Sequence, residues 1–362
     1  MSNKIDIYEP LQLIAAYEQA DKEGIWLRDR YFPTNPSTDL FTTDEVYVEI
    51  KDKGDKLTAP FIVPEEGGRY IERKGYRSSR LAPAFMGLKT KLTFDDLKKK
   101  GFGEEYFKQY DPETRARKLL MRDMTDMEAR FNRSEEMMCA KLLTGNGYEL
   151  KHSGAEYSNP EIYKNFKVQF FDGSDPTKYT PSKVWAKDVD TIIDDIRAMV
   201  EMLEENNAPA SDLIVSLDVA QVIYKNVQIR EDIKTFSNIN LMQGQLSPEK
   251  LPNNVTKVCV LNVWGTPITV YAYSGKYVDP ETKQESLYIP NGTAILTAPA
   301  CGKMLYGGIE AMNDAGEFEL VSAKRLPEMH VFKEKKTREL HICSRPLAVP
   351  GAMNPWVHAK VL

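Results

Sequence analysis

The feature of this 362-residue chain that most constrains its fold is one helical pattern from Pro112 to Leu143. Asp111 is a suitable N-cap, and Pro112 suits the first helical position. Apolar residues then recur at three-, four- and seven-residue steps on one narrow stripe: Leu120, Met124, Met127, Phe131, Met138 and Leu142. Turn residues from Gly145 to Gly147 end the pattern. At ~1.5 Å per residue this predicts a rod of roughly 48 Å. Because no heptad repeat is sustained, we expect a structural spine rather than a coiled coil.

A basic hairpin is predicted between Gly54 and Leu92. The apolar run Leu57–Val63 is followed by a turn and by a returning run, Tyr70–Lys74. An isolated two-stranded hairpin is marginal in water. Between Arg69 and Lys91 a single acid, Glu72, stands against seven cations, which are Arg69, Arg73, Lys74, Arg77, Arg80, Lys89 and Lys91. The segment therefore reads either as an arm that meets an acidic surface of a second molecule or as a solvated loop.

Residues 183–316 read as a compact α/β unit. An amphipathic helix is predicted from Val189 to Leu203, and a buried strand follows at Leu213–Leu217. Two further strands, Lys257–Asn262 and Ile268–Tyr273, flank a Trp-Gly turn, and Thr293–Thr297 is the last strand of the unit.

The chain after this unit is again β-rich and needs a sheet partner. The predicted late strands are Phe318–Ala323, His330–Lys333, Arg338–Cys343 and Trp356–Val361. The early strands at Val46–Ile50 and Phe166–Phe171 are available to pair with them. This pairing would make residues 183–316 an insertion between two halves of one sheet-plus-helix domain.

Composition indicates a folded chain and gives no sign of a membrane or nucleic-acid protein. Hydrophobic residues make up 42%, charged residues 28%, and the net charge is −5. No stretch is apolar enough to span a bilayer, and the first residues lack the apolar core of a signal peptide. The four cysteines are scattered without a Cys-x-x-Cys pair, so we expect reduced and mostly buried thiols: Cys139, Cys259, Cys301 and Cys343.

Two groups of residues could carry chemistry, and each has a more ordinary explanation. His341 and Cys343 share a face of a predicted strand and could form a nucleophile pair or half a metal site, but no third group stands at a recognisable spacing. Asp188, Asp190, Asp194 and Asp195 could bind a metal, yet acids at a helix start serve the helix dipole. Phosphate-binding loops and hydrolase motifs are absent from the sequence. We therefore expect no enzyme activity and no cofactor.

Several stretches, in order along nearly the whole chain, match one known family. They are Trp26–Arg28, Phe41–Tyr47, Ala59–Val63, Tyr70–Gly75, Arg115–Met127, Tyr273–Val278, Pro290–Thr293 and Ser344–Leu347. With these the chain resembles the lambda-type major capsid proteins of tailed bacteriophages, which share the capsid fold named after phage Hong Kong ninety-seven. Residues 148–255 match weakly, and Pro33–Asp39 looks like an insertion.

The resemblance implies an α+β fold of five segments. Residues 1–53 would form an N-terminal arm and lead-in strand, and 54–92 an extended E-loop hairpin. Residues 93–182 would be the first part of a peripheral domain that carries the spine helix 112–143. Residues 183–316 would be an inserted axial domain, and 317–362 the second part of the peripheral domain.

The resemblance also implies a mechanical function. Copies would form pentamers and hexamers of an icosahedral shell around double-stranded DNA, in a virion assembled in the host cytoplasm, with a scaffolding protein, a portal and a decoration protein as partners. The expected inter-subunit residues are Arg69, Tyr70, Arg73, Lys74, Arg77 and Arg80. They would face acids near 188–195 or 201–205 of a neighbour, or the exposed acids of an adjacent spine helix. Two alternatives stay open: an encapsulin-like compartment of the same fold, and an enzyme whose site holds His341 and Cys343.

Overall fold

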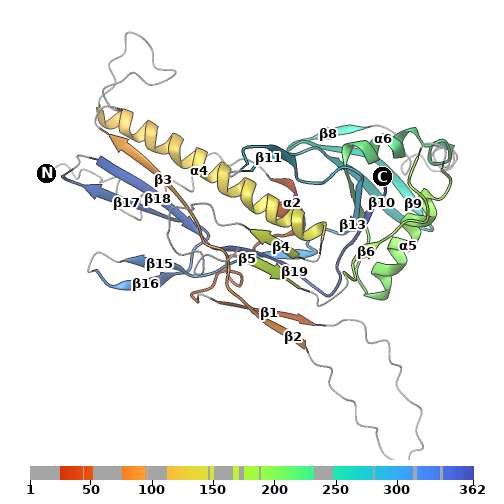
Figure 1. Ribbon diagram of the computed structural model, residues 1–362, viewed down its shortest axis with the longest axis horizontal. Helices are drawn as coiled ribbons and strands as arrows, with labels where there is room; N and C mark the ends of the chain where they lie inside the picture. Colours follow the sequence, from red (N-terminus) through yellow and green to blue (C-terminus); the bar gives the residue numbers. More distant parts are fainter. Residues whose placement is uncertain are drawn as a thin grey trace, which may run out of the picture.

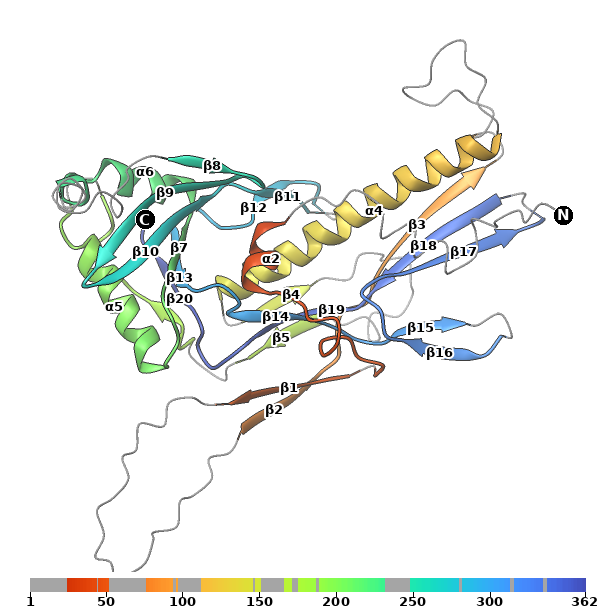
Figure 2. The ribbon, with the colours of Figure 1, turned by 180° about the vertical axis from the view of Figure 1, so that it is seen from behind.

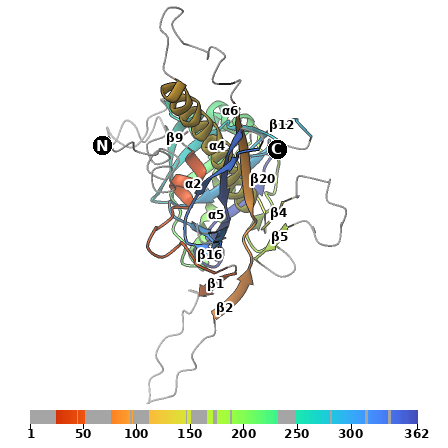
Figure 3. The same cartoon turned by 90° about the vertical axis from the view of Figure 1, so that its left-hand side faces the viewer.

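The computed structural model describes residues 25–43, 45–51, 76–93, 96, 112–145, 147–150, 166–170, 175–186, 189–231, 248–279, 282–312, 316–334 and 337–362 (Figure 1). The described chain is elongated. Helix α4 (Pro112–Leu143) runs from a large sheet at one end toward a group of hairpins at the other (Figures 1 and 2). A two-stranded ribbon projects to one side (Figure 3). None of the helices in the described ranges is both long and apolar enough to cross a membrane.

Helix α4 confirms the predicted spine, with the same first and last residues. All six members of its apolar stripe are buried. The stripe serves two cores. Its first four members pack with Leu340 and Ile342, whereas Met138 and Leu142 join a larger central cluster that includes Tyr31 of α2 (Trp26–Tyr31). The spine therefore ties two parts of the molecule together.

The first core lies between α4 and a three-stranded antiparallel sheet. Its central strand is β18 (Thr337–Ser344), flanked by β17 (Leu326–Phe332) and β3 (Met86–Thr93). Strand β3 fits here because Met86 and Leu88 alternate with polar residues and pack on the cluster beneath α4.

The predicted partners of the late strands are wrong. The strand expected at Val46–Ile50 is β1 (Val46–Lys51), which pairs with β2 (Tyr76–Leu81). The strand expected at 166–171 is β5 (Phe166–Gln169), which pairs with β4 (Gly147–Leu150). Their buried residues explain the difference, because Val46, Val48 and Val168 face the central cluster rather than the cluster beneath α4.

The other end of the molecule is a seven-stranded mixed sheet in the order β6-β20-β13-β7-β10-β9-β8. Its strands are β6 (Lys178–Tyr179), β7 (Asp212–Val215), β8 (Glu249–Leu251), β9 (Val255–Val263), β10 (Thr266–Tyr273), β13 (Thr293–Thr297) and β20 (Val357–Lys360). Helices α5 (Ile192–Glu205) and α6 (Leu217–Lys225) pack on the face that carries Leu213 and Val215, while Ile214 faces the central cluster. The helix and strands predicted within 183–316 are confirmed.

Strand β20 corrects the expectation that the final strand belongs, with the other late strands, to the sheet-plus-helix domain outside residues 183–316. It lies between β6 and β13, parallel to β6 and antiparallel to β13. Val357, Ala359 and Val361 are buried among the side chains of α5 and β13. The last strand is apolar on its α5 face and therefore completes this sheet.

Three further short antiparallel pairs are described. Strand β14 (Gly302–Tyr306) pairs with β19 (Pro346–Pro350), and this pair lies in the central cluster. The hairpin β15 (Ile309–Met312) and β16 (Phe318–Val321) projects at the same end as β17 and β18 (Figure 1). The third pair is β11 (Lys276–Val278) with β12 (Glu285–Leu287).

Candidate inter-subunit surfaces and the network behind them

The ribbon β1–β2 has one docked face and one free face. Val46 and Val48 are buried in the central cluster. On the other face, the Arg80 guanidinium carbon lies 4.8 Å from the Tyr47 ring centroid, and Arg80 Nη1 lies 3.6 Å from Glu45 Oε2. All three side chains are largely exposed. The base of the predicted arm is thus anchored on one side and presents a cation beside an aromatic ring on the other.

Only part of the predicted contact set lies in this ribbon. Arg77 stands opposite Ile50, and Arg80 stands opposite Tyr47. The hairpin strands expected at Leu57–Val63 and Tyr70–Lys74, and with them the four contact residues Arg69, Tyr70, Arg73 and Lys74, lie outside the described residues. The role of the six residues stays a prediction.

The hairpin β15–β16 carries an apolar exposed face. Phe318 is 86% exposed, and Met312 stands directly opposite it in the register. Leu320, two residues along the same strand, is exposed on the same face. A two-stranded hairpin with such a face is typical of a surface that another molecule covers.

The turn between β9 and β10 presents another exposed aromatic ring. Trp264 is 78% exposed, and the Arg197 guanidinium carbon of α5 lies 4.3 Å from its ring centroid. The turn lies beside α5, at the end of the molecule away from β17 and β18 (Figure 2).

His341 and Cys343 share the face of β18 turned away from α4, as predicted. His341 Nε2 lies 3.4 Å from Glu339 Oε2, and the His341 ring centroid lies 4.3 Å from that of His330. Burial raises the pKa of Cys343 to about 11, so this thiol stays protonated at neutral pH. Cys139, Cys259 and Cys301 are free and buried, as expected. No three His, Cys, Asp or Glu side chains in the described part of the chain gather as a metal site would require.

The acids at the start of α5 have a structural explanation. Asp195 is buried, and its carboxylate accepts hydrogen bonds from Tyr179 Oη at 2.8 Å and from Trp185 Nε1 at 2.8 Å. Asp190 and Asp194 are exposed, and Asp188 lies outside the described residues. The bonds to Asp195 hold the segment before α5 against the helix.

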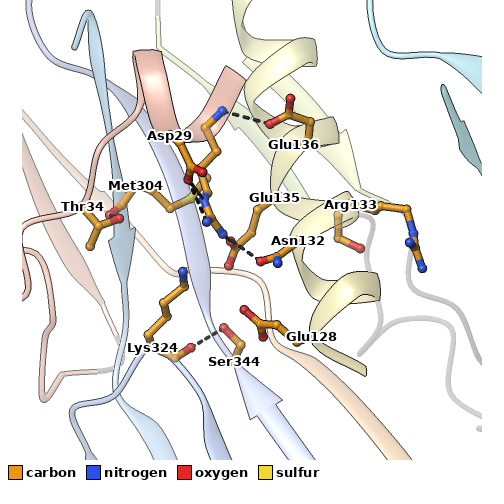
Figure 4. A network of polar contacts seen from close by, with 12 residues as sticks. Asp29, Thr34, Glu128, Asn132, Arg133, Glu135, Glu136, Met304, Lys324 and Ser344 are labelled. Atoms are coloured by element: carbon orange, nitrogen blue, oxygen red, sulfur yellow. Dashed lines mark hydrogen bonds and ion pairs between the residues drawn. The ribbon is translucent and has the colours of Figure 1, made fainter. Parts of the chain in front are cut away.

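The densest polar cluster lies behind these surfaces, on the middle of α4. Figure 4 shows Asn132 and Glu135 pointing from α4 toward the segment of Lys324. Arg28 of α2 reaches the same place, with Nη1 2.5 Å from Glu135 Oε2 and 2.9 Å from Asn132 Oδ1. Arg325 approaches from the segment before β17. Three chain segments far apart in sequence therefore meet at one carboxylate.

Arg325 binds two carboxylates of the spine. Its Nη1 lies 2.6 Å from Glu135 Oε1, and its Nε lies 3.1 Å from Glu128 Oε2. Burial alone would raise the pKa of Glu135, but Arg325, Lys324 and Arg28 outweigh it and lower that pKa to about 2. For Glu128 burial prevails over Arg325, and its pKa is raised. Glu135 is therefore the charged centre of the network.

Glu136, the next residue, caps helix α2 from outside. Its carboxylate accepts the backbone N–H groups of Trp26, Leu27 and Arg28 at 3.2, 2.8 and 2.9 Å, and the Tyr273 hydroxyl at 2.8 Å. These backbone N–H groups are the ones that have no partner within the helix at its start.

Sequence reasoning missed this whole network. The available signal was the presence of acids at 128 and 135, four residues after the stripe members Met124 and Phe131.

Comparison with known proteins agrees with this geometry. The family described as Phage major capsid protein E matches residues 11–361. The major capsid protein of Escherichia phage lambda is 24% identical over 365 residues, covering 99% of this chain and 100% of that protein. A crystal structure of a protein assigned to the capsid of a prophage of E. coli CFT073 has a TM-score of 0.65 at 17% identity, covering 98% of this chain and 99% of that one. A phage-related protein from Bordetella bronchiseptica has a TM-score of 0.49 at 10% identity, covering 99% and 98%. The likeness to the prophage protein shows a shared fold, which is the mixed helix-and-strand capsid fold that the resemblance predicts.

Proposed function

Because the chain belongs to the family described as Phage major capsid protein E, it is a structural protein of the phage head, and we propose that its copies form pentamers and hexamers of an icosahedral shell around packaged double-stranded DNA. The observation that carries this proposal is the family match over residues 11–361, which leaves almost none of the chain for another function. Family membership gives the chain a structural rather than a catalytic role.

The shape of the subunit supports a proposal in which its two ends make different contacts in the shell. We assign the axial contacts around each ring to the seven-stranded sheet with α5 and α6, which β6 and β20 join from outside residues 183–316. We assign the contacts between rings to the opposite end of the molecule, where the first half of α4, the strands β17 and β18 and the hairpin β15–β16 lie (Figure 1). The spine α4 joins the two, because its stripe enters both cores. Force on one end of the subunit is then passed to the other through one rigid helix.

The arm would act as a clamp between copies. Its base, β1–β2, is anchored by Val46 and Val48, and its free face carries Arg80. The contact residues would be Arg69, Tyr70, Arg73, Lys74, Arg77 and Arg80, set against acids near 188–195 or 201–205 of the next copy. Each exposed ion pair contributes only about 0–1 kcal/mol, but several in one seam, repeated in every subunit, decide whether a shell closes.

Partners follow from the assembly that is proposed. A scaffolding protein would set curvature, a portal would occupy one vertex, and a decoration protein would bind the finished surface. The net charge of −5 suits a container, because DNA enclosed by such a wall does not adhere to it over the whole surface.

Negative-stain electron microscopy of the expressed chain, alone and with a scaffold, tests the shell. We expect closed shells, tubes or ring-shaped capsomers. A compact monomer by sedimentation at high concentration with scaffold present would contradict the proposal.

Charge reversal tests the clamp. In the triple variant Arg73→Glu, Lys74→Glu and Arg77→Glu, we expect native-like circular dichroism but slow or absent assembly by light scattering, because the arm would then repel the acids that it meets. High salt should weaken assembly of the parent in the same direction. The matched control reverses three exposed lysines on other strands, Lys167, Lys178 and Lys250. Equal assembly of both variants and the parent would show that the arm is only a solvated loop.

A further inference from the structure

The turn between β9 and β10 contains Trp264, a residue type that the backbone of this turn disfavours. Trp264 has φ 50° and Gly265 has φ 93°, so both central residues of this two-residue turn are left-handed. Asn-Gly suits such a turn, whereas a Trp there is strained by its own side chain. The ring is 78% exposed and is not part of a core cluster of the described chain. Strain and exposure together point to a role outside the isolated subunit.

The ring is nevertheless held in a fixed position. Arg197 lies over it, with its guanidinium carbon 4.3 Å from the ring centroid, and Arg197 Nε is in turn 2.9 Å from Glu201 Oε1. The Gly265 N–H donates to Asn262 Oδ1 at 2.9 Å and fixes the turn itself. A side chain ordered before a partner arrives loses less conformational freedom on binding.

A complementary apolar surface lies on α6 of the same sheet. Its inner face, with Val219, Ala220 and Ile223, is buried against the sheet. Leu217 and Tyr224 are seven residues apart, so they share the outer face, and both are exposed, as is Val227 just after the helix. Helix α6 and the β9–β10 turn lie at the same end of the molecule but at different edges of it (Figure 2).

We infer that Trp264 of one copy packs on the surface formed by Leu217, Tyr224 and Val227 of the next copy around a ring. A ring of identical subunits needs two different patches on each subunit, one complementary to the other. The turn and the α6 surface are two different exposed patches, and both are positioned by the one core cluster that α6, β9 and β10 share. Trp and Arg are the residues most enriched among those that dominate interface energies. The inference rests on the proposed function, because it requires that the axial unit form rings, and it names the side chains that close them.

Engineered disulfides test the pairing directly. In a Cys343→Ala background, Trp264→Cys combined with Tyr224→Cys should give, on mild oxidation of assembled protein, a covalent ladder that ends at five or six chains on a non-reducing gel. The pair Trp264→Cys with Val278→Cys is the control, since Val278 is 61% exposed but lies in β11. An equal ladder from both pairs, or none from the first, would overturn the inference.

A side-chain deletion gives an independent readout. We expect Trp264→Ala to keep the circular dichroism and melting temperature of the parent and to assemble about tenfold more slowly, as a central aromatic contact requires. Val278→Ala should assemble like the parent. If the parent forms shells and Trp264→Ala assembles at the same rate, the inference is overturned but the proposed function stands. If the parent itself formed neither shells nor rings, the proposed function would fail first.

Discussion

Two regions on the spine helix are stabilised by different kinds of interaction, one by apolar packing and the other by buried ion pairs. Beneath its first half, Leu120, Met124 and Met127 meet Leu340 and Ile342 in a cluster of apolar side chains. Around its middle, Glu128 and Glu135 are just as inaccessible, but they are matched by cations from α2 and from the segment before β17. The same helix thus passes from an apolar to an ionic interior within three turns.

The two regions have different consequences, because the apolar region contributes mainly to stability and the ionic region mainly to the geometry of the subunit. Apolar packing tolerates small shifts, because many arrangements of similar side chains fill a core about equally well. A buried ion pair adds little net stability over well-packed apolar groups, yet losing one member is costly. Arg28 and Arg325 each bind one oxygen of Glu135, so we infer that the network fixes how α2 and β17 sit on the spine. In a shell, where every copy must present the same surfaces, that fixed geometry is what assembly requires.

The largest effect should come from removing the centre of the network. Glu135→Ala leaves Arg28 and Arg325 buried without their shared partner, which should lower the free energy of unfolding by roughly 3–5 kcal/mol. Urea denaturation of unassembled protein measures this. Glu135→Gln keeps the shape and one acceptor oxygen but turns a donor NH2 toward one of the two guanidinium groups, so it should recover only part of this loss. A loss under ~1 kcal/mol for Glu135→Ala would mean that the cations find other partners, and that the network does not set geometry.

A smaller effect is expected in the apolar region. Met124 is fully buried, and Met124→Ala should cost roughly 2–5 kcal/mol through lost contacts and a cavity. Met121, one turn earlier and only half-buried, gives the matched control, with a smaller loss expected for Met121→Ala. We further expect Met124→Ala shells, once formed, to have parental symmetry in electron micrographs. Misassembled Met124→Ala particles would show that the apolar core sets geometry as well.

The apolar region was the one that sequence could predict. The spine was found with its true ends because its cap and its stripe are local signals, all within Asp111 to Gly147. The packing partner was not found. Met86, Leu88 and Leu92 of β3 follow a strand period, but the cations Lys89 and Lys91 between them led us to place the segment in the arm. Charge on the solvent face of a strand does not argue against the strand.

The ionic region could not be predicted because its members are distant in the chain. Arg28 and Glu135 are 107 positions apart, and Arg325 and Glu128 are 197 apart. One sequence contains nothing that pairs residues at such distances. What could be noticed is that two carboxylates fall next to a buried stripe, where charges are rare without partners. That observation predicts cations nearby but does not identify them.

The smallest expected effect tests the network through pH. Burial lowers the pKa of Lys324 to about 8 from its usual 10.5; Glu135 opposes the shift, and Arg28 and Arg325 add to it. Between these two values the unfolded chain binds the proton more tightly than the folded chain does. The contribution of Lys324 to the free energy of unfolding therefore rises as pH increases from 8 toward 10.5.

Replacing this lysine should remove that rise. We expect the free energy of unfolding of Lys324→Met to exceed that of the parent by the largest amount at pH 7. This difference should shrink steadily toward pH 10, because the ammonium group of Lys324 in the parent loses its charge over this range. Urea denaturation of both proteins at pH 7, 8, 9 and 10 gives the difference, in which all other titrating groups cancel to first order. The exposed Lys178→Met is the control and should run parallel to the parent. A Lys324→Met curve that also runs parallel would mean that Lys324 keeps its charge through this range, and that the ionic region is more open to water than its burial indicates.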